Sequence, residues 1–163
     1  MILVALGSNL NSQFGPPGPT LHAALAALEN NQTHVDAVSR FYETAAWPNP
    51  SEPIYTNAVC KLSTKLAPGA LLAHLHSIER SFGRIRNTTY SPRTLDLDIL
   101  DYDGFVQEGP PILPHPRMAS RGFVLVPLRD VAAGWRHPVT GISLGDLIAA
   151  LPPDERTLKL ANS

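Results

Sequence analysis

The chain has 163 residues and a mass of 17.6 kDa, the size of a single domain with a substantial core, so we expect one domain over 1–163. Thirteen Lys and Arg against fourteen Asp and Glu give a net charge of −1, which offers no argument for nucleic acid or an anionic membrane as a partner. The single cysteine, Cys60, cannot form an intramolecular disulfide, and the sequence has no Cys/His cluster of the kind that holds structural zinc. The N-terminus has no basic segment and only a short apolar run, so we expect a cytoplasmic monomer without a signal peptide or membrane span.

The first half of the chain is predicted to form a strand, a helix and two further strands. Residues 2–6 are an unbroken apolar run bounded by turn residues, which is typical of a strand buried on both faces. Leucines at helical spacing follow Thr20, which we expect to be the N-cap of an amphipathic helix. Residues 35–42 and 57–64 have the pattern of strands, and the proline-rich segment 45–53 between them is too long for a tight turn.

The second helix has the clearest pattern, with apolar residues at helical spacing before the stop at Gly83. A polar, basic stretch over 84–93 leads into an apolar strand over 95–100. The order β-α-β-β-α-β is typical of a ferredoxin-like α+β fold with an antiparallel sheet and its helices on one face. The rest of the chain is expected to be a C-terminal extension with short helices near 124–133 and 143–151.

Two carboxylates stand out on the last of these strands. Asp96 and Asp98 alternate with Leu95, Leu97 and Ile99, so the two aspartates face the same way, about 7 Å apart along the strand. That spacing does not suit a shared proton, but it suits joint binding of Mg²⁺ together with phosphate oxygens. An Asp-x-Asp pair taken alone is more often a solvated strand face.

Arginines gather around the two aspartates, and in a protein of near-neutral charge this favours a clamp for a polyphosphate over a merely soluble surface. Other polar residues remain open to either interpretation: His115 lies between two prolines in a loop, and Glu79 borders the apolar stripe of the second helix. Arg84 follows the helix stop and is expected to become ordered only when substrates bind. The arginines in question are Arg80, Arg84, Arg86, Arg93 and Arg121.

The sequence resembles the 6-hydroxymethyl-7,8-dihydropterin pyrophosphokinase family along nearly its whole length. The resemblance implies a ferredoxin-like α+β fold and the transfer of diphosphate from ATP to the pterin hydroxymethyl group, with release of AMP, in folate biosynthesis. It rests on these motifs: LGSNL at 6–10, SRFYET at 39–44, YTNA at 55–58, IERSFGR at 78–84, SPRTLDLDIL at 91–100, PHPRM at 114–118 and RGFVLVPL at 121–128.

The resemblance also implies roles for individual residues. Asp96 and Asp98 would hold two Mg²⁺ ions, and Arg84 and Arg93 would be the catalytic phosphate arginines. The other positions that would bind ATP are His76, Glu79, Arg86, Tyr90, Ile99, His115 and Arg121. The positions that would bind the pterin are Thr44, Tyr55, Asn57 and Phe123.

The sequence departs from the family pattern at Asn87, Tyr90 and Pro116, at His76, and in the loop 45–53, which leaves the adenine contacts and the loop conformations open. Two other classes of protein remain as alternatives. A metal-dependent nucleotidyltransferase would also use paired aspartates on a strand but would release pyrophosphate instead of AMP. A non-enzymatic ferredoxin-like binding module would leave the two aspartates without a function.

Overall fold

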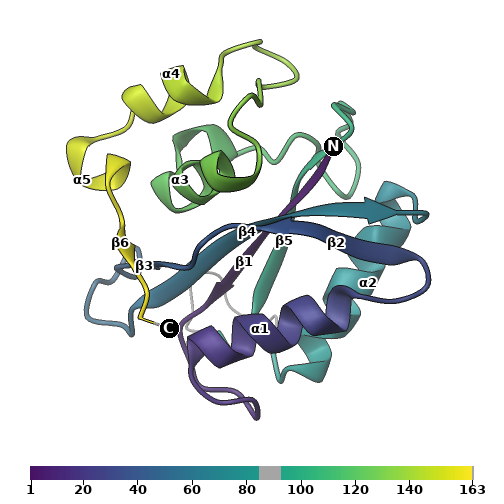
Figure 1. The fold of residues 1–163 in the computed structure, drawn as a ribbon, viewed down its shortest axis with the longest axis vertical. Helices are drawn as coiled ribbons and strands as arrows, with labels where there is room; N and C mark the ends of the chain where they lie inside the picture. Colours follow the sequence, from purple (N-terminus) through teal and green to yellow (C-terminus); the bar gives the residue numbers. More distant parts are fainter. Residues whose placement is uncertain (85–92, 163) are drawn as a thin grey trace.

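The computed structural model describes residues 1–84 and 93–162, and its centre is one antiparallel sheet (Figure 1). The strands lie in the order β5-β1-β4-β3-β6, with β2 also paired to β4. This is the strand order of a ferredoxin-like fold, so the predicted α+β class is confirmed. The six strands are β1 (Ile2–Ser8), β2 (Thr33–Val38), β3 (Tyr42–Thr44), β4 (Tyr55–Thr64), β5 (Asp96–Tyr102) and β6 (Lys159–Leu160).

Helices cover both faces of this sheet. In Figure 1, α1 and α2 lie on one side and α3 and α4 on the other. The predicted layer of helices on one face is therefore the α1–α2 layer, and the C-terminal extension supplies the second. The helices are α1 (Pro17–Leu28), α2 (Pro68–Ser81), α3 (Gly122–Val131), α4 (Leu144–Ala149) and α5 (Pro153–Arg156), with a 3-10 turn, η1, at Met118–Ser120.

The sheet is buried on both sides because its central strand alternates. Val4 and Leu6 of β1 belong to the core beneath α1 and α2, whereas Leu3 belongs to the core beneath α3 and α4. All three are almost completely buried, and each contributes roughly 2 kcal/mol of transfer free energy. An unbroken apolar run is the pattern that burial on both faces requires, as the sequence predicted for this strand.

Two local predictions were wrong. Thr20 is not the N-cap of α1: the helix begins at Pro17, and the Thr20 hydroxyl lies inside it and donates to the Pro16 carbonyl at 2.9 Å. Prolines suit a first turn because they lack the N–H groups that a cap would satisfy. The single strand expected over 35–42 is divided into two strands, β2 and β3. The Ser39 side chain accepts a hydrogen bond from the backbone N–H of Val59 at 2.9 Å, and this bond interrupts the regular backbone pairing with β4.

None of the helices in the described part of the chain is long and apolar enough to cross a bilayer.

Strand β5 is longer than expected and contains an irregularity where its pairing with β1 shifts. At this shift Leu100 turns toward the core beneath α3 and α4. The two aspartates at the start of the strand precede the shift and keep their regular alternation.

Candidate active site

Three neighbouring strands bring the predicted metal side and the predicted pterin side together. Asp96 of β5 is paired with Gly7 of β1, and Gly7 is paired with Asn57 of β4. Residues directly opposite one another in an antiparallel sheet project to the same face. A Cβ on Gly7 would lie 3.0 Å from Asn57 Oδ1, so the glycine leaves the space between the carboxylate and the amide open.

Asp98 follows on the same face, opposite Ala5. Burial raises the pKa of its carboxyl above the usual range, and the negative charges of Asp96 and Glu79 raise it further. The carboxylates here are crowded and poorly solvated, which disfavours the ionised form of Asp98, and a divalent cation would favour that form. The donor set, two carboxylates on one strand face, therefore fits Mg²⁺ that is completed by phosphate oxygens and water.

Arg84 is already held by carboxylates in this structure. Its Nη1 donates to Glu79 at 2.6 Å and also to Asp96, and the side chain is only 10% exposed. The structure thus pairs the Arg84 guanidinium with two carboxylates without substrates, and its ordering on substrate binding stays a prediction. The physical reason is electrostatic, because two carboxylates within ion-pair reach of a poorly solvated guanidinium hold it in place.

Glu79 lies in the last turn of α2, beside the apolar stripe of that helix as expected, and its side chain is completely buried. One carboxylate oxygen accepts a hydrogen bond from the backbone N–H of Leu97 at 3.2 Å, and the other accepts one from Nη1 of Arg84. The side chain thus ties α2 to the strand that carries the aspartates. Its predicted contact with ATP stays a prediction.

Arg93 is fixed by its backbone as well as by its side chain. Its Nη1 lies 3.1 Å from Asp96 Oδ2, and its N–H donates to Asn9 Oδ1 at 2.8 Å. The N–H of Asn9 in turn donates to the Arg93 carbonyl at 3.2 Å, and Asn9 Nδ2 donates to the Pro53 carbonyl at 3.1 Å.

Asn9 is a connecting residue that sequence reasoning missed. It joins the end of β1, the segment that leads into β5 and the loop before Tyr55. The available signal was its position in the turn directly after a buried strand, where an asparagine side chain commonly binds nearby backbone.

The predicted pterin side lies where β4 begins and β3 ends. Asn57 is buried and donates to the Thr44 hydroxyl at 2.7 Å, so the amide has a fixed orientation. Tyr55 is half-buried, and this burial raises the pKa of its hydroxyl. The positive charge of Arg93 acts in the opposite direction and lowers the pKa of that hydroxyl, so the tyrosine lies close to Arg93.

Arg121 and Phe123 lie at the start of α3, above the same face of the sheet. The helix begins at Gly122, two residues before the predicted start, and Arg121 is its N-cap. The Arg121 guanidinium lies 5.4 Å from the centre of the Phe123 ring, and Phe123 is 36% exposed. An aromatic ring that remains partly exposed beside a cation offers a surface on which a flat heterocycle can stack.

His115 has a defined hydrogen-bonding pattern. Its backbone N–H donates to the Leu100 carbonyl at 2.8 Å, and its ring Nδ1 accepts a hydrogen bond from the backbone N–H of Arg117 at 3.1 Å. Burial lowers its pKa to about 4, and the nearby charges of Arg121 and Arg117 act in the same direction. The ring is therefore neutral at pH 7 and carries its proton on Nε2, which makes it a donor to an anion.

The other predicted ATP-binding positions lie around this centre or outside the described residues. His76 is on α2, three residues before Glu79 and thus on a neighbouring part of the helix surface. The Ile99 side chain is buried in the core beneath α1 and α2, which leaves its backbone for the predicted adenine contact. Arg86 and Tyr90 fall in residues 85–92, outside the described residues, as does the departure at Asn87.

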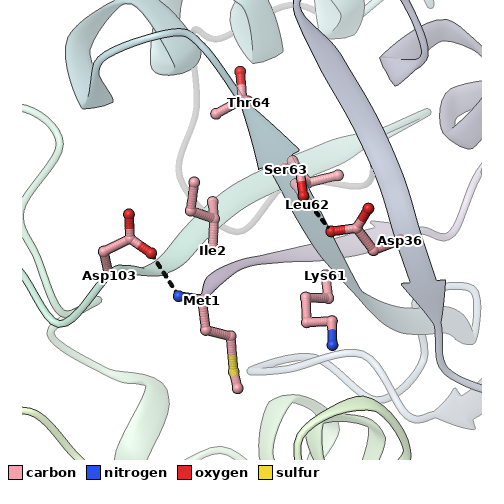
Figure 2. Close-up of a pocket in the computed structure, with 8 residues that line it drawn as sticks. All are labelled: Met1, Ile2, Asp36, Lys61, Leu62, Ser63, Thr64 and Asp103. Atoms are coloured by element: carbon pink, nitrogen blue, oxygen red, sulfur yellow. Dashed lines mark hydrogen bonds and ion pairs between the residues drawn. The ribbon is translucent and has the colours of Figure 1, made fainter.

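A separate hollow of about 310 Å³ lies at the opposite end of the central strands (Figure 2). In Figure 2 the N-terminal ammonium of Met1 pairs with Asp103, and Ser63 bonds to Asp36. The hollow is shallow and polar and is lined by the paired residues Ile2 and Leu62, at the other end of β1 from Gly7, which is paired with Asp96. It is not part of the candidate active site.

Comparison with known proteins shows which family the chain is similar to. The model of the family described as 7,8-dihydro-6-hydroxymethylpterin-pyrophosphokinase matches residues 3–133. A 2-amino-4-hydroxy-6-hydroxymethyldihydropteridine pyrophosphokinase of Haemophilus influenzae is 42% identical over 132 residues, which are 80% of this chain and 80% of that protein. One of the same description from Pseudomonas aeruginosa is 41% identical over 153 residues, 93% of this chain and 91% of that protein.

A longer relative has the same segment within it. The folic acid synthesis protein fol1 of Pneumocystis carinii is 35% identical over 144 residues, which are 88% of this chain but only 19% of that protein. These matches confirm the resemblance seen in the motifs and identify an enzyme, not a binding module. With the family model spanning strands β1 to β5 and helices α1, α2 and α3, the chain belongs to the 7,8-dihydro-6-hydroxymethylpterin-pyrophosphokinase family.

Proposed function

We propose that the protein transfers diphosphate from ATP to the hydroxymethyl oxygen of 6-hydroxymethyl-7,8-dihydropterin in a Mg²⁺-dependent reaction that releases AMP. The observation that carries this proposal is the row Asp96–Gly7–Asn57 across three strands. It places a carboxylate suited to a metal–phosphate complex beside an amide suited to a pterin. We further propose that the protein works as a monomer in the cytoplasm on these two small molecules.

The reaction is an in-line displacement at the β-phosphorus. The hydroxymethyl oxygen forms a bond to the β-phosphorus, the bond from that phosphorus to the oxygen bridging to the α-phosphate breaks, and AMP leaves. The hydroxyl proton is released to solvent. Such a transfer depends mainly on positioning and on neutralisation of charge, both of which this chain can supply.

Asp96 and Asp98 would hold Mg²⁺, for which we propose two ions, and the metal would neutralise the negative charge of the triphosphate. Arg93, with its backbone fixed by Asn9, presents a guanidinium beside these carboxylates. His115, neutral with its proton on Nε2, adds an uncharged hydrogen-bond donor for the triphosphate.

The pterin would be held on the other side of Gly7. Phe123 offers a ring for stacking, and Asn57 offers an amide that can both donate to and accept from the polar edge of the heterocycle. The Thr44 hydroxyl fixes that amide at 2.7 Å, and the backbone of Thr44 is the proposed second contact.

Product analysis with both substrates and Mg²⁺ tests this function against the nucleotidyltransferase alternative. We expect one AMP for each diphosphorylated pterin, which phosphorus NMR and nucleotide chromatography would both register. Release of pyrophosphate with a nucleotide attached to the pterin would overturn the proposal. Asp98→Asn serves as the matched inactive control, since it preserves the size of the side chain.

A further inference from the structure

The C-terminal segment makes a close contact with the start of α3. The N–H of Gly122 donates to Glu155 Oε2 of α5 at 3.1 Å. A Cβ on Gly122 would lie 2.5 Å from the carbonyl oxygen of Glu155 and 2.8 Å from its Cβ, so only glycine fits here. Gly122 lies between Arg121 and Phe123, the two residues of α3 assigned to the substrates.

The start of α3 depends on this contact because the helix has no side-chain cap of its own. Its N-cap residue, Arg121, makes no capping hydrogen bond, and its first turn contains no acidic residue. The carboxylate of Glu155, although far along the chain, supplies both missing features. It accepts a hydrogen bond from the first N–H of the helix, and it places a negative charge at the positive end of the helix.

Glu155 is itself held in place from both sides. Before it, Leu151 is buried in the core beneath α3 and α4. After it, β6 pairs with β3, so that Leu160 lies opposite Tyr42 and Lys159 lies opposite Glu43. The tail therefore connects the start of α3 to β3, the strand that ends at Thr44 on the pterin side.

We infer that Glu155 is a positioning residue for the pterin half of the active site: it holds the first turn of α3, and with it Phe123, in the binding arrangement. This inference rests on the proposed function for its substrate. When the first turn is released, only a fraction of the molecules present the ring correctly, and the apparent affinity for the pterin falls by that fraction.

The test is Glu155→Ala, with Asp154→Ala as the matched control because Asp154 is an exposed carboxylate of the same helix, α5. We expect Glu155→Ala to raise the Kd of the pterin roughly tenfold, measured by calorimetry with a non-reactive ATP analogue bound, as loss of a helix cap would. The Kd of the ATP analogue should change less than about twofold, because its other proposed contacts do not pass through α5. Glu155→Gln keeps an acceptor oxygen and should restore most of the pterin affinity.

Two further measurements separate positioning from a general loss of stability. Amide hydrogen exchange should accelerate at Gly122 in Glu155→Ala but not in Asp154→Ala, since the Gly122 N–H loses its acceptor. Gly122→Ala should reproduce the loss of pterin affinity by displacing α5, whereas Gly145→Ala, which has open space around the added methyl group, should not.

The outcomes distinguish this inference from the function on which it rests. Wild-type protein that binds no pterin would overturn the proposed function, and the exchange data alone would then decide whether Glu155 anchors α3. Wild-type protein that binds the pterin, together with an unchanged pterin Kd in Glu155→Ala, would overturn the positioning role. An equal loss of pterin and ATP affinity would also overturn it, since it would show a general structural effect.

Discussion

The guanidinium of Arg84 lies 2.6 Å from the carboxylate of Glu79, although Glu79 is completely buried and Arg84 follows the end of the same helix. The other oxygen of Glu79 accepts the Leu97 N–H, so every oxygen of this buried carboxylate has a partner. A buried charge is tolerated only when it is paired in this way. The pair therefore links the stability of the fold to a residue assigned to catalysis.

Glu79→Ala should lower the free energy of unfolding by about 3 kcal/mol, because it leaves the buried Leu97 N–H without its acceptor and removes an ion-pair partner of Arg84. Glu79→Gln keeps an acceptor for Leu97 and should cost less. Urea denaturation measures both, with the exposed Glu108→Ala as the control. If all three variants had the same free energy of unfolding as wild type, the buried pair would contribute nothing to the stability of the fold.

Arg84→Ala should lower kcat by roughly a hundredfold or more while it changes the Kd of ATP by less than about threefold. The guanidinium is bound to carboxylates without substrate, so a contact with phosphate replaces an existing ion pair and adds little net binding energy. Single-turnover kinetics and equilibrium titration with an ATP analogue separate the two quantities. If binding and the chemical step suffer equally, Arg84 is a ground-state anchor.

Asp96→Ala and Asp98→Ala should each reduce turnover by several orders of magnitude, as expected when the ligands of an essential metal are lost. The fold should survive both changes. For Asp98 the crowding of negative charge that raises its pKa is relieved, so the melting temperature should stay the same or rise. A magnesium titration of activity in which either variant reaches the wild-type rate would contradict the metal assignment.

Phe123→Ala should weaken binding of the pterin by roughly 1–3 kcal/mol through loss of stacking and apolar contact, with a smaller effect on ATP. The ring lies 5.4 Å from the Arg121 guanidinium and is partly exposed, so little core packing is lost with it. Calorimetry in the presence of a non-reactive ATP analogue measures the change. Phe123→Leu is the matched variant that keeps apolar area but removes the aromatic face, and an unchanged affinity in both would exclude stacking.

The elements with a strong periodic pattern could be predicted from the sequence alone. β1 and α2 follow directly from an apolar run and a helical spacing, and the alternation of Asp96 and Asp98 with leucines correctly places both carboxylates on one face. These features are local, so a pattern within a few residues determines them.

The features that sequence reasoning missed depend on partners far along the chain. Asn9 binds Arg93 and Pro53, and Glu79 binds a strand that begins seventeen residues later, at Asp96. The placement of the C-terminal layer depends on contacts such as that of Gly122 with α5. No periodicity reports such pairings, because they are determined by packing of the complete fold.

The pH dependence of stability offers a last test, through His115. Burial and neighbouring cations lower its pKa from 6.5 to about 4, so between these values the unfolded chain binds a proton that the folded protein does not. The free energy of unfolding should therefore fall as the pH is lowered from about 6.5 to about 4, and the contribution of His115 should reach on the order of 2–3 kcal/mol. In His115→Gln this contribution is absent, so the free energy of unfolding should fall more for wild type than for the variant between pH 7 and pH 4.5. Urea denaturation without Mg²⁺ measures both. Parallel pH profiles for the two proteins would show that the imidazole is protonated equally in the folded and unfolded states, and would remove the argument for a neutral donor at this position.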